Sequence, residues 1–309
     1  MAARRFTRIL CPVDFSDAST HAVDHAIAIA GWYAAGLTLL HVCLPVATGV
    51  PELPPPDNPT PAPTPAPDMQ RAGEQIGDSL RAAKAAGISA DVFVDVGRPA
   101  ADILNRATSL PADLIVMGTH GAGGFEHLAL GSITEKVLRR ATCPVLTVPP
   151  RAHATSVLPF KRLLCAVDFS DWSLEALTLA ISIAQESGAT LTLLHVLEWP
   201  WEEPPAPAFG ELPVEQASAL SEYRRYAEKS AMTRLRSLVP DASRDRVGVT
   251  PRITNGKAYA GILRMASEEQ TDLIVLGVHG RRALDVMLLG STTHQVIRRA
   301  TCPVLTLRR

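Results

Sequence analysis

Aromatic side chains and net charge are both scarce in this sequence. Phe, Trp and Tyr make up 5% of the 309 residues, which argues against stacking platforms for single-stranded nucleic acid and against an aromatic-rich β-barrel. Thirty Lys and Arg residues balance 31 Asp and Glu residues, so the formal net charge is −1. We therefore expect no nucleic-acid partner and no electrostatic attraction to an anionic membrane.

Long apolar runs and cysteine pairs are also missing. No apolar run reaches the roughly 18 to 20 residues that cross a bilayer, and no apolar stretch of signal-peptide length follows the arginines near the N-terminus. These absences predict a cytoplasmic protein. The five cysteines show no Cys-x-x-Cys spacing, and each lies in or beside an apolar run. We expect buried free thiols rather than disulfides or a zinc site.

A catalytic apparatus cannot be recognised in the sequence. It contains no G-x-x-x-x-G-K-[ST] motif, and no Ser/His/Asp or Cys/His arrangement stands out as a nucleophilic site. No group of side chains has the spacing of a metal cage. We therefore predict no catalytic residue and no metal ion held by protein side chains alone.

The sequence does contain two copies of one unit. Residues 113–147 align without gaps to residues 272–306, with 21 identities in 35 positions. The repeat is about 155 residues long, a domain length rather than the roughly 20 to 50 residues of a solenoid unit. We predict a first domain over residues 1–149, a linker over 150–160 and a second domain over 161–309.

Each copy alternates short apolar strands with amphipathic helices. Strands such as 114–117 and 273–276 are apolar at every position, which indicates burial on both faces and hence a parallel sheet covered by helices. The predicted fold is therefore an open α/β domain, with its ligand crevice at the carboxyl ends of the strands. The other strands are expected near 9–13, 37–42, 90–96, 145–148, 163–167, 190–196, 247–253 and 304–307, and the helices of the first copy near 17–34, 68–86, 100–110 and 132–141.

Two proline-rich segments interrupt this pattern. Residues 44–67 contain ten prolines, and residues 199–213 are a shorter counterpart in the second copy. Such segments cannot form a helix or an inner strand, so we predict extended loops. Two roles remain open for them, a lid or partner-docking element and a solvated tether.

A glycine motif follows the fourth strand of each copy. Gly118, Gly121, Gly131 and Ser132 form the pattern G-x2-G-x9-G-S, and the second copy repeats it with Gly277, Gly280, Gly290 and Ser291. We expect Gly118 to let a ligand approach the backbone, because glycine has no Cβ atom. Gly131 and Ser132 precede a predicted helix, where exposed N–H groups and the helix dipole suit a phosphate chain.

The same crevice is expected to receive side chains from the first two strands. Asp14 and Asp168 end the first strand of each copy, where a carboxylate can accept hydrogen bonds from an adenine amino group or ribose hydroxyls. Helix capping is the structural alternative for Asp14, although Ser16 and Asp17 can serve that need. Val42 and Val196 end the second strand and could form apolar walls for a base.

At these residues the chain resembles the universal stress protein family. The glycine motif, the Val-Asp at the end of the first strand, the His-Val at the end of the second and the terminal Thr-Cys-Pro-Val-Leu all match. The resemblance covers nearly the whole chain as two tandem copies. It implies five parallel strands per copy in the order 3-2-1-4-5, helices on both faces, and two copies paired through their last strands about a pseudo-twofold axis. Family members with the full glycine motif bind ATP.

Carried onto this sequence, the resemblance implies one nucleotide site in each copy. Ala166 replaces the proline of the first copy, a mild departure. His120 and His279 lie within the glycine loops, where a phosphate contact is open to them, and His41 and His195 are interpreted as core histidines. The expected residues are Pro12, Asp14, Val42, Met117, Gly118, Gly121, Gly131, Ser132 and Ile133 in the first site, and Ala166, Asp168, Val196, Leu276, Gly277, Gly280, Gly290, Ser291 and Thr292 in the second.

The function indicated is that of an ATP-binding universal stress protein with a regulatory or protective role and little or slow hydrolysis. The expected ligand is ATP, with or without Mg²⁺ carried on its phosphates. The expected assembly is the pairing of domains within the chain, with a homodimer of chains left open. Two alternatives are kept, a nucleotide-free interaction module of the same fold and a true ATPase or nucleotidyl-transfer enzyme.

Overall fold

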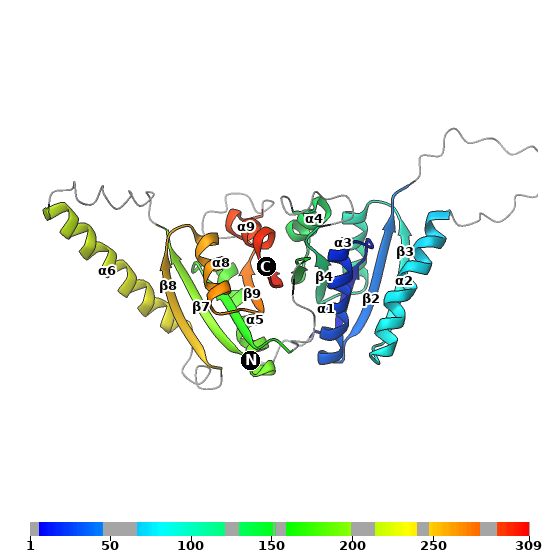
Figure 1. The fold of residues 1–309 in the computed structure, drawn as a ribbon, viewed down its shortest axis with the longest axis horizontal. Coiled ribbons are helices and arrows are strands. Elements are labelled where there is room, and N and C mark those ends of the chain that lie inside the picture. The colour runs from blue at the N-terminus through cyan, green and yellow to red at the C-terminus, as the bar shows by residue number, and fades with distance from the viewer. Residues whose placement is uncertain are drawn as a thin grey trace, which may run out of the picture.

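The computed structural model describes residues 6–45, 67–120, 130–150, 152, 159–198, 214–239, 247–278 and 289–308. Strands and helices alternate along both halves of the chain (Figure 1). The first half contains β1 (Arg8–Pro12), α1 (Asp17–Tyr33), β2 (Gly36–Cys43), α2 (Pro67–Ala85), β3 (Ala90–Val96), α3 (Pro99–Ser109), β4 (Leu114–Gly118), α4 (Ser132–Arg140) and β5 (Val145–Val148).

The second half repeats this succession of elements. Its helix α6 is longer than its counterpart α2, and the figure shows one end of it projecting beyond the sheet (Figure 1). The elements are β6 (Arg162–Ala166), α5 (Asp171–Ser187), β7 (Thr190–Leu197), α6 (Val214–Ser237), β8 (Val249–Asn255), α8 (Ala258–Glu268), β9 (Leu273–Gly277), α9 (Ser291–Arg299) and β10 (Val304–Leu307).

The strands of both halves form one continuous sheet. Its order is β3-β2-β1-β4-β5-β10-β9-β6-β7-β8, so each half has the expected order 3-2-1-4-5 and all its strand pairs are parallel. The halves meet where β5 and β10 pair antiparallel, with Leu146 opposite Leu305. The two expected five-stranded sheets are thus joined through their last strands into a single ten-stranded sheet.

Reciprocal side-chain hydrogen bonds reinforce this junction. Thr147 Oγ1 donates to the carbonyl of Val304, and Thr306 Oγ1 donates to the carbonyl of Val145, each at 3.2 Å. Both threonines are almost fully buried, so their hydroxyl groups need such partners. The equivalence of the two bonds shows that the halves are related by a pseudo-twofold axis at this point.

Each face of the sheet carries one hydrophobic core that extends over both halves. The core under α1, α2, α5 and α6 contains both Leu146 and Leu305. The core under α3, α4, α8 and α9 contains Ile115 from β4 and Ile274 from β9. Strands such as Leu114–Gly118 are buried at every position because they lie between these two cores.

The cysteines agree with the sequence-based expectation of free thiols. All five cysteines are free thiols, four of them buried, and burial raises the pKa of Cys11 and Cys165 far above the ordinary thiol range. Within the described ranges, none of the helices combines the length and hydropathy that crossing a membrane requires. The proline-rich stretches fall mostly outside the described residues, so the two roles considered for them stay open.

Candidate functional site

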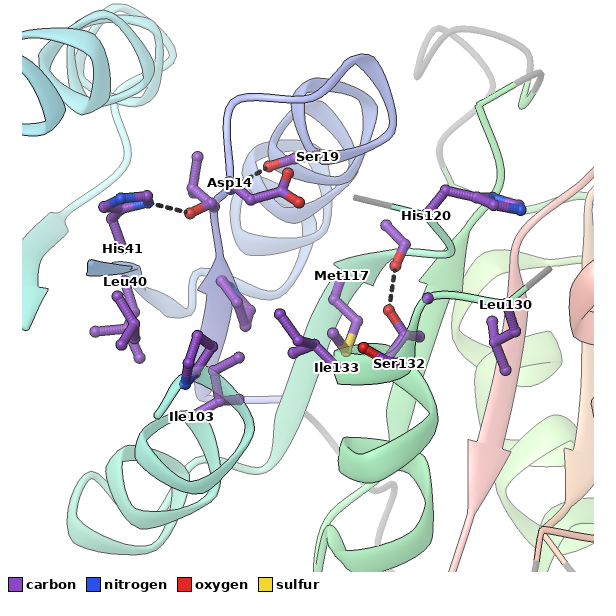
Figure 2. Close-up of a pocket in the computed structure, with 17 residues that line it drawn as sticks. Asp14, Ser19, Leu40, His41, Ile103, Met117, His120, Leu130, Ser132 and Ile133 are labelled. Carbon is purple, nitrogen blue, oxygen red and sulfur yellow. Dashed lines mark hydrogen bonds between the residues drawn. The ribbon is translucent and has the colours of Figure 1, made fainter. Parts of the chain in front are cut away.

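A cavity of about 410 Å³ opens at the carboxyl ends of β1, β2 and β4 in the first half (Figure 2). Strand order reverses between β1 and β4, and the crevice beside such a reversal is where open α/β sheets bind ligands. Apolar side chains make up much of the wall. The lining residues are Pro12, Val13, Asp14, Ser19, Leu40, His41, Val42, Pro99, Ile103, Met117, Gly118, His120, Leu130, Gly131, Ser132, Ile133 and Thr134.

The structure brings the residues predicted for the first site together around this cavity. They come from three separate strand ends and from the start of α4, and the sheet topology places them at one edge. The residues that line the cavity are Pro12, Asp14, Val42, Met117, Gly118, Gly131, Ser132 and Ile133. Gly121, the remaining one, lies outside the described residues.

Asp14 lies in a turn that its own carboxylate holds together. Its Oδ1 accepts hydrogen bonds from the N–H of Ser16 at 3.1 Å and from the hydroxyl of Ser16 at 2.6 Å. Ser16 in turn caps α1 by accepting from the N–H of Ser19, whose own hydroxyl accepts from the N–H of Asp14. Asp14 therefore supports the capped turn and lines the cavity as well, so the two alternatives considered for it are not exclusive.

His41 is anchored at the end of β2. Its Nδ1 lies 2.7 Å from the carbonyl oxygen of Val13, and its ring stacks on Phe15 with ring centroids 4.6 Å apart. A carbonyl oxygen can only accept a hydrogen bond, so Nδ1 carries the proton. His41 is thus a satisfied histidine, as expected, but it also belongs to the cavity wall.

Helix α4 begins without a side-chain cap, in contrast to α1. Gly131 is its N-cap residue and offers no side-chain acceptor, whereas Ser16 supplies one at α1. The first N–H groups of α4 therefore need another acceptor, and they lie where Gly131, Ser132 and Ile133 line the cavity. Together with the positive end of the helix dipole, this arrangement suits an anionic group.

Gly118 lines the cavity, and the structure adds a packing reason for glycine at this position. A Cβ atom built at Gly118 would lie 2.9 Å from the backbone carbon and oxygen of Ala18 in α1. In the second half, a Cβ at Gly277 would meet the backbone of Trp172 at the same distance. The missing side chain therefore lets the first turn of α1 pack against the end of β4, a packing role that the sequence did not predict.

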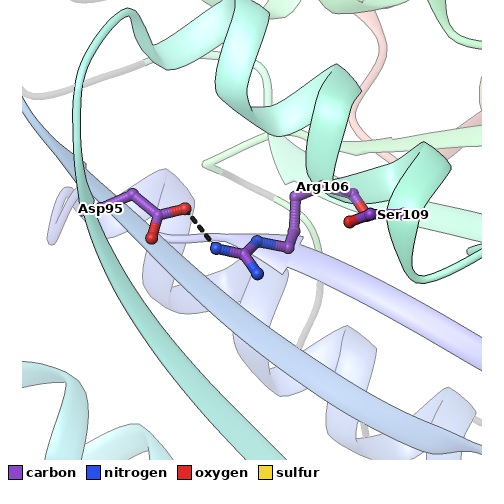
Figure 3. A network of polar contacts seen from close by, with 3 residues as sticks. All are labelled: Asp95, Arg106 and Ser109. Carbon is purple, nitrogen blue, oxygen red and sulfur yellow. Dashed lines mark hydrogen bonds and ion pairs between the residues drawn. The ribbon is translucent and has the colours of Figure 1, made fainter.

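Helix α3 forms the outer wall and is tied to β3 by an ion pair. Arg106 Nη2 lies 2.7 Å from Asp95 Oδ2 (Figure 3). The guanidinium also lies over the ring of Phe93, 4.2 Å from its centroid. Both charged side chains are roughly one-quarter to one-third exposed. These contacts hold α3 where its residues Pro99 and Ile103 reach the cavity.

The second half reproduces the turn and the histidine anchor. Asp168 Oδ1 accepts from the N–H and the hydroxyl of Ser170 at 3.0 and 2.5 Å, and His195 Nδ1 lies 2.7 Å from the carbonyl oxygen of Val167. Helix α9 also starts at an N-cap glycine, Gly290, without a side-chain cap. The equivalent strand and helix ends hold the other residues predicted for the second site, namely Ala166, Val196, Leu276, Gly277, Ser291 and Thr292. Gly280 lies outside the described residues.

The outer walls of the two halves differ. Arg264 of α8 donates to the hydroxyl of Thr254, and Glu198 accepts a hydrogen bond from the N–H of Ala258 at 2.9 Å. Gly261 lets α8 approach β7 closely, since a Cβ there would lie 3.2 Å from a methyl group of Val196. The strand-end chemistry is therefore duplicated, whereas the helix that covers it is held by different contacts.

Several lining residues were not among those predicted. Pro99 and Ile103 come from α3, and Ser19 and Thr134 lie in the first turns of α1 and α4. Thr134 donates its hydroxyl to the carbonyl of Gly118 at 3.0 Å, a bond that Thr293 repeats with Gly277. The recurrence of both threonines at the same distance from the glycine motif was a signal that could have identified them.

Side chains able to hold a metal ion do not gather in the described part of the chain, where no group of three or more His, Cys, Asp or Glu residues is found. His120 lines the cavity, and its Nδ1 lies 2.8 Å from the hydroxyl of Thr119. His279, for which a phosphate contact was left open, lies outside the described residues.

Comparisons with known proteins agree with this architecture. The model of the universal stress protein family matches residues 5–149 and again residues 159–308. A universal stress protein of Mycolicibacterium smegmatis is 30% identical over 306 residues, covering 97% of this chain and 96% of its own length. A universal stress protein of Bacillus subtilis is 32% identical over 160 residues, covering 48% of this chain and 99% of its own length.

A solved structure shows the same fold over the whole length. The crystal structure of a universal stress protein from Archaeoglobus fulgidus has a TM-score of 0.66 and 24% identity, with 99% of this chain and 97% of that chain covered. The duplicated family match, the full-length relative and the shared fold lead to one conclusion. The chain belongs to the universal stress protein family and carries two copies of the family's domain in tandem.

Proposed function

We propose that this protein binds ATP in the crevice of each half and acts as a regulatory or protective protein of the stress response. The observation that carries the proposal is the cavity of about 410 Å³, which brings together a strand end, a carboxylate and an uncapped helix start. These three features suit the base, the ribose and the phosphates of one nucleotide, respectively.

The backbone at Val42 suits adenine. Along β2, Leu40 O accepts from Val13 N–H on the β1 side, and Cys43 O accepts from Gly97 N–H on the β3 side. Backbone groups of alternate residues point the same way in a strand, so Val42 N–H and C=O face the side where β1 has ended. Adenine offers an acceptor at N1 and a donor at its amino group, which complement this pair.

The remaining parts of the nucleotide fit Asp14 and the start of α4. Asp14 Oδ1 is engaged by Ser16, and the carboxylate lines the cavity, where it can accept from ribose hydroxyls. The N–H groups at the start of α4 and the hydroxyl of Ser132 would receive the phosphates. Asp14 is the one carboxylate among the lining residues of this cavity, so a Mg²⁺ ion would be held mainly by the phosphates.

Binding with slow hydrolysis is favoured over rapid turnover. The residues that line the cavity include neither lysine nor arginine. They therefore lack the cation that commonly stabilises a transferring phosphoryl group. A role in which nucleotide occupancy changes a partner surface fits these residues better than an ATPase or a nucleotidyl-transfer enzyme. Steady-state phosphate release well above ~1 per minute, against typical enzyme values of about 10 per second, would favour the enzyme instead.

Charge at the helix start provides the test. Ser132 is exposed at the first position of α4, and Ser291 takes the same position in α9. Aspartate there favours the helix dipole but repels phosphate. We expect the Ser132→Asp, Ser291→Asp double variant to melt at or above the parent's temperature, to lose at least about tenfold in ATP affinity and to bind adenosine unchanged.

Isothermal titration calorimetry with ATP and with adenosine measures these affinities. Lys136→Gln, an exposed change in the second turn of α4, is the matched control and is expected to retain ATP binding within about twofold. The proposal fails if the parent binds neither ligand, or if the double variant binds ATP as tightly as the parent does.

A further inference from the structure

The ladder between the first two strands of each half, β1–β2 and β6–β7, ends one rung early. Gly36 N–H donates to Thr7 O, a partner 29 residues earlier, and Val13 N–H donates to Leu40 O. A regular parallel ladder repeats every two residues, so the next rung would join Val42 N–H to Val13 O, a partner at the same spacing. That oxygen instead accepts the Nδ1–H of His41 at 2.7 Å.

The adjoining residue turns the chain away from the ladder. Phe15 has a φ angle of 63°, in the left-handed region that non-glycine residues rarely adopt, and its ring stacks on His41. The second half has the same arrangement, since Phe169 has a φ angle of 65° and stacks on His195 with centroids 4.5 Å apart. Both copies of the repeated unit therefore end the ladder by the same contacts.

We propose that His41 and His195 are positioning residues that give the crevice its preference for adenine. By occupying the Val13 oxygen, His41 keeps Val42 N–H out of the ladder and leaves it facing the cavity that Val42 lines. The freed N–H is the donor that adenine N1 requires. Without the imidazole, the Val13 oxygen would be open to Val42 N–H, and the ladder could extend by one rung. The inference rests on the proposed binding of adenine nucleotides.

The histidine acts through the backbone, so its effect should depend on the base. Inosine triphosphate carries N–H at N1 and a carbonyl oxygen at C6, the reverse of the adenine pattern. In the pose that places adenine N1 against Val42 N–H, inosine therefore presents a second donor to that N–H instead of an acceptor. Removal of the imidazole should therefore weaken ATP and leave inosine triphosphate nearly unchanged, whereas general damage to the crevice would weaken both nucleotides alike.

The experiment compares two double variants, so that both halves change together. His41→Phe with His195→Phe keeps a ring to stack on Phe15 and Phe169 but removes the donor. His41→Asn with His195→Asn retains an N–H donor close to the position of Nδ1. We expect the Phe pair to lose about tenfold in ATP affinity and in the ratio of ATP to inosine triphosphate affinity, and the Asn pair to retain most of both.

The matched control is His25→Phe on α1. His25 is also buried, and its Nδ1 lies 2.8 Å from the carbonyl of His21, away from the cavity. We expect this variant to keep the parent's nucleotide ratio. Thermal melts of all variants separate loss of fold from loss of selectivity.

Hydrogen exchange in the unaltered protein gives a second measurement that needs no variant. The amide of Val42 should exchange readily without nucleotide and become protected when ATP is added. Protection of this amide in the nucleotide-free protein would overturn the inference, as would a Phe pair that folds and keeps the parent's nucleotide ratio. If the parent binds no nucleotide at all, the proposed function itself fails, so the two failures can be distinguished.

Discussion

Gly118 illustrates how a single residue can serve packing while lining a cavity. The position of its absent Cβ is 2.9 Å from backbone atoms of Ala18, a distance that cannot relax by a side-chain rotation. Gly73 in α2 is the opposite case, because a Cβ there would have no heavy atom within 4 Å. Glycine is therefore required at the first position and dispensable at the second.

These two glycines give matched stability predictions. Gly118→Ala should lower the free energy of unfolding by about 1 to 3 kcal/mol, because the helix must move away from the strand end. Gly73→Ala, in the interior of a helix, should raise it by about 0.5 to 1 kcal/mol. Urea denaturation measures both changes. A neutral Gly118→Ala variant would show that α1 can shift at little cost.

His25 is a single residue that makes the free energy of unfolding depend on pH. Burial lowers the pKa of its imidazole below the ordinary value of 6.5. The unfolded chain therefore binds a proton as the pH falls below about 6.5 while the folded chain resists it, so stability is lost in that direction. His25→Gln should reduce the fall in unfolding free energy between pH 7.5 and 5.5, measured by urea titrations. An unchanged slope would contradict this assignment.

Helices α1 and α5 start in a different way from α4 and α9. Ser16 and Ser170 cap α1 and α5 with a side-chain oxygen, and each also donates its hydroxyl to the aspartate of the same turn. Helices α4 and α9 start at glycines that cannot cap. The starts of α1 and α5 are thus completed by the chain itself, whereas those of α4 and α9 carry the N–H groups to which we assign the phosphates in the proposed function.

The capped start yields a prediction for both stability and binding. Ser16→Ala removes the acceptor for the N–H of Ser19 and a donor to Asp14 Oδ1. We expect a loss of about 1 kcal/mol in unfolding free energy and a weaker affinity for ATP, because Asp14 is then less well oriented. Thr20→Ala, which removes an exposed hydroxyl from the same helix, is the control. If Ser16→Ala binds ATP as tightly as the parent does, the cap makes no contribution to ATP binding.

Local sequence patterns predicted these elements well, but they could not predict the contacts between segments that are distant in the sequence. The continuous apolar run at Leu114 marked β4, and Ser16 marked the start of α1, because burial and capping act on neighbouring residues. The hydrogen bond from His41 to the Val13 carbonyl and the pairing of Arg106 with Asp95 depend on where the backbone places separate elements. No spacing in the sequence encodes those distances.

At the scale of the whole molecule, the halves share one sheet and two cores. Leu305 of β10 is opposite Leu146 of β5, and both belong to the core that covers one face of both halves. Because the core extends across the junction, unfolding of one half exposes apolar surface of the other. We therefore expect a single cooperative transition in calorimetry.

A charge at the junction of β5 and β10 should split the single unfolding transition into two. Leu305 is 2% exposed, so Leu305→Asp places a carboxylate in a dry core and should lower stability by several kcal/mol. We expect two separate transitions in this variant. Val96→Asp, at a position that is 53% exposed, should leave the parent's single transition intact. Two transitions in the parent would show instead that the halves unfold independently.

The reciprocal threonine bonds across β5 and β10 have a consequence for how such a molecule can change. In a dimer of identical subunits, any substitution at the twofold axis occurs on both sides at once. Here Thr147 and Thr306 are encoded separately, so one can be exchanged while the other is kept. Fusion into one polypeptide thus frees each half to diverge, and the unequal walls built by α3 and α8 are what such freedom allows.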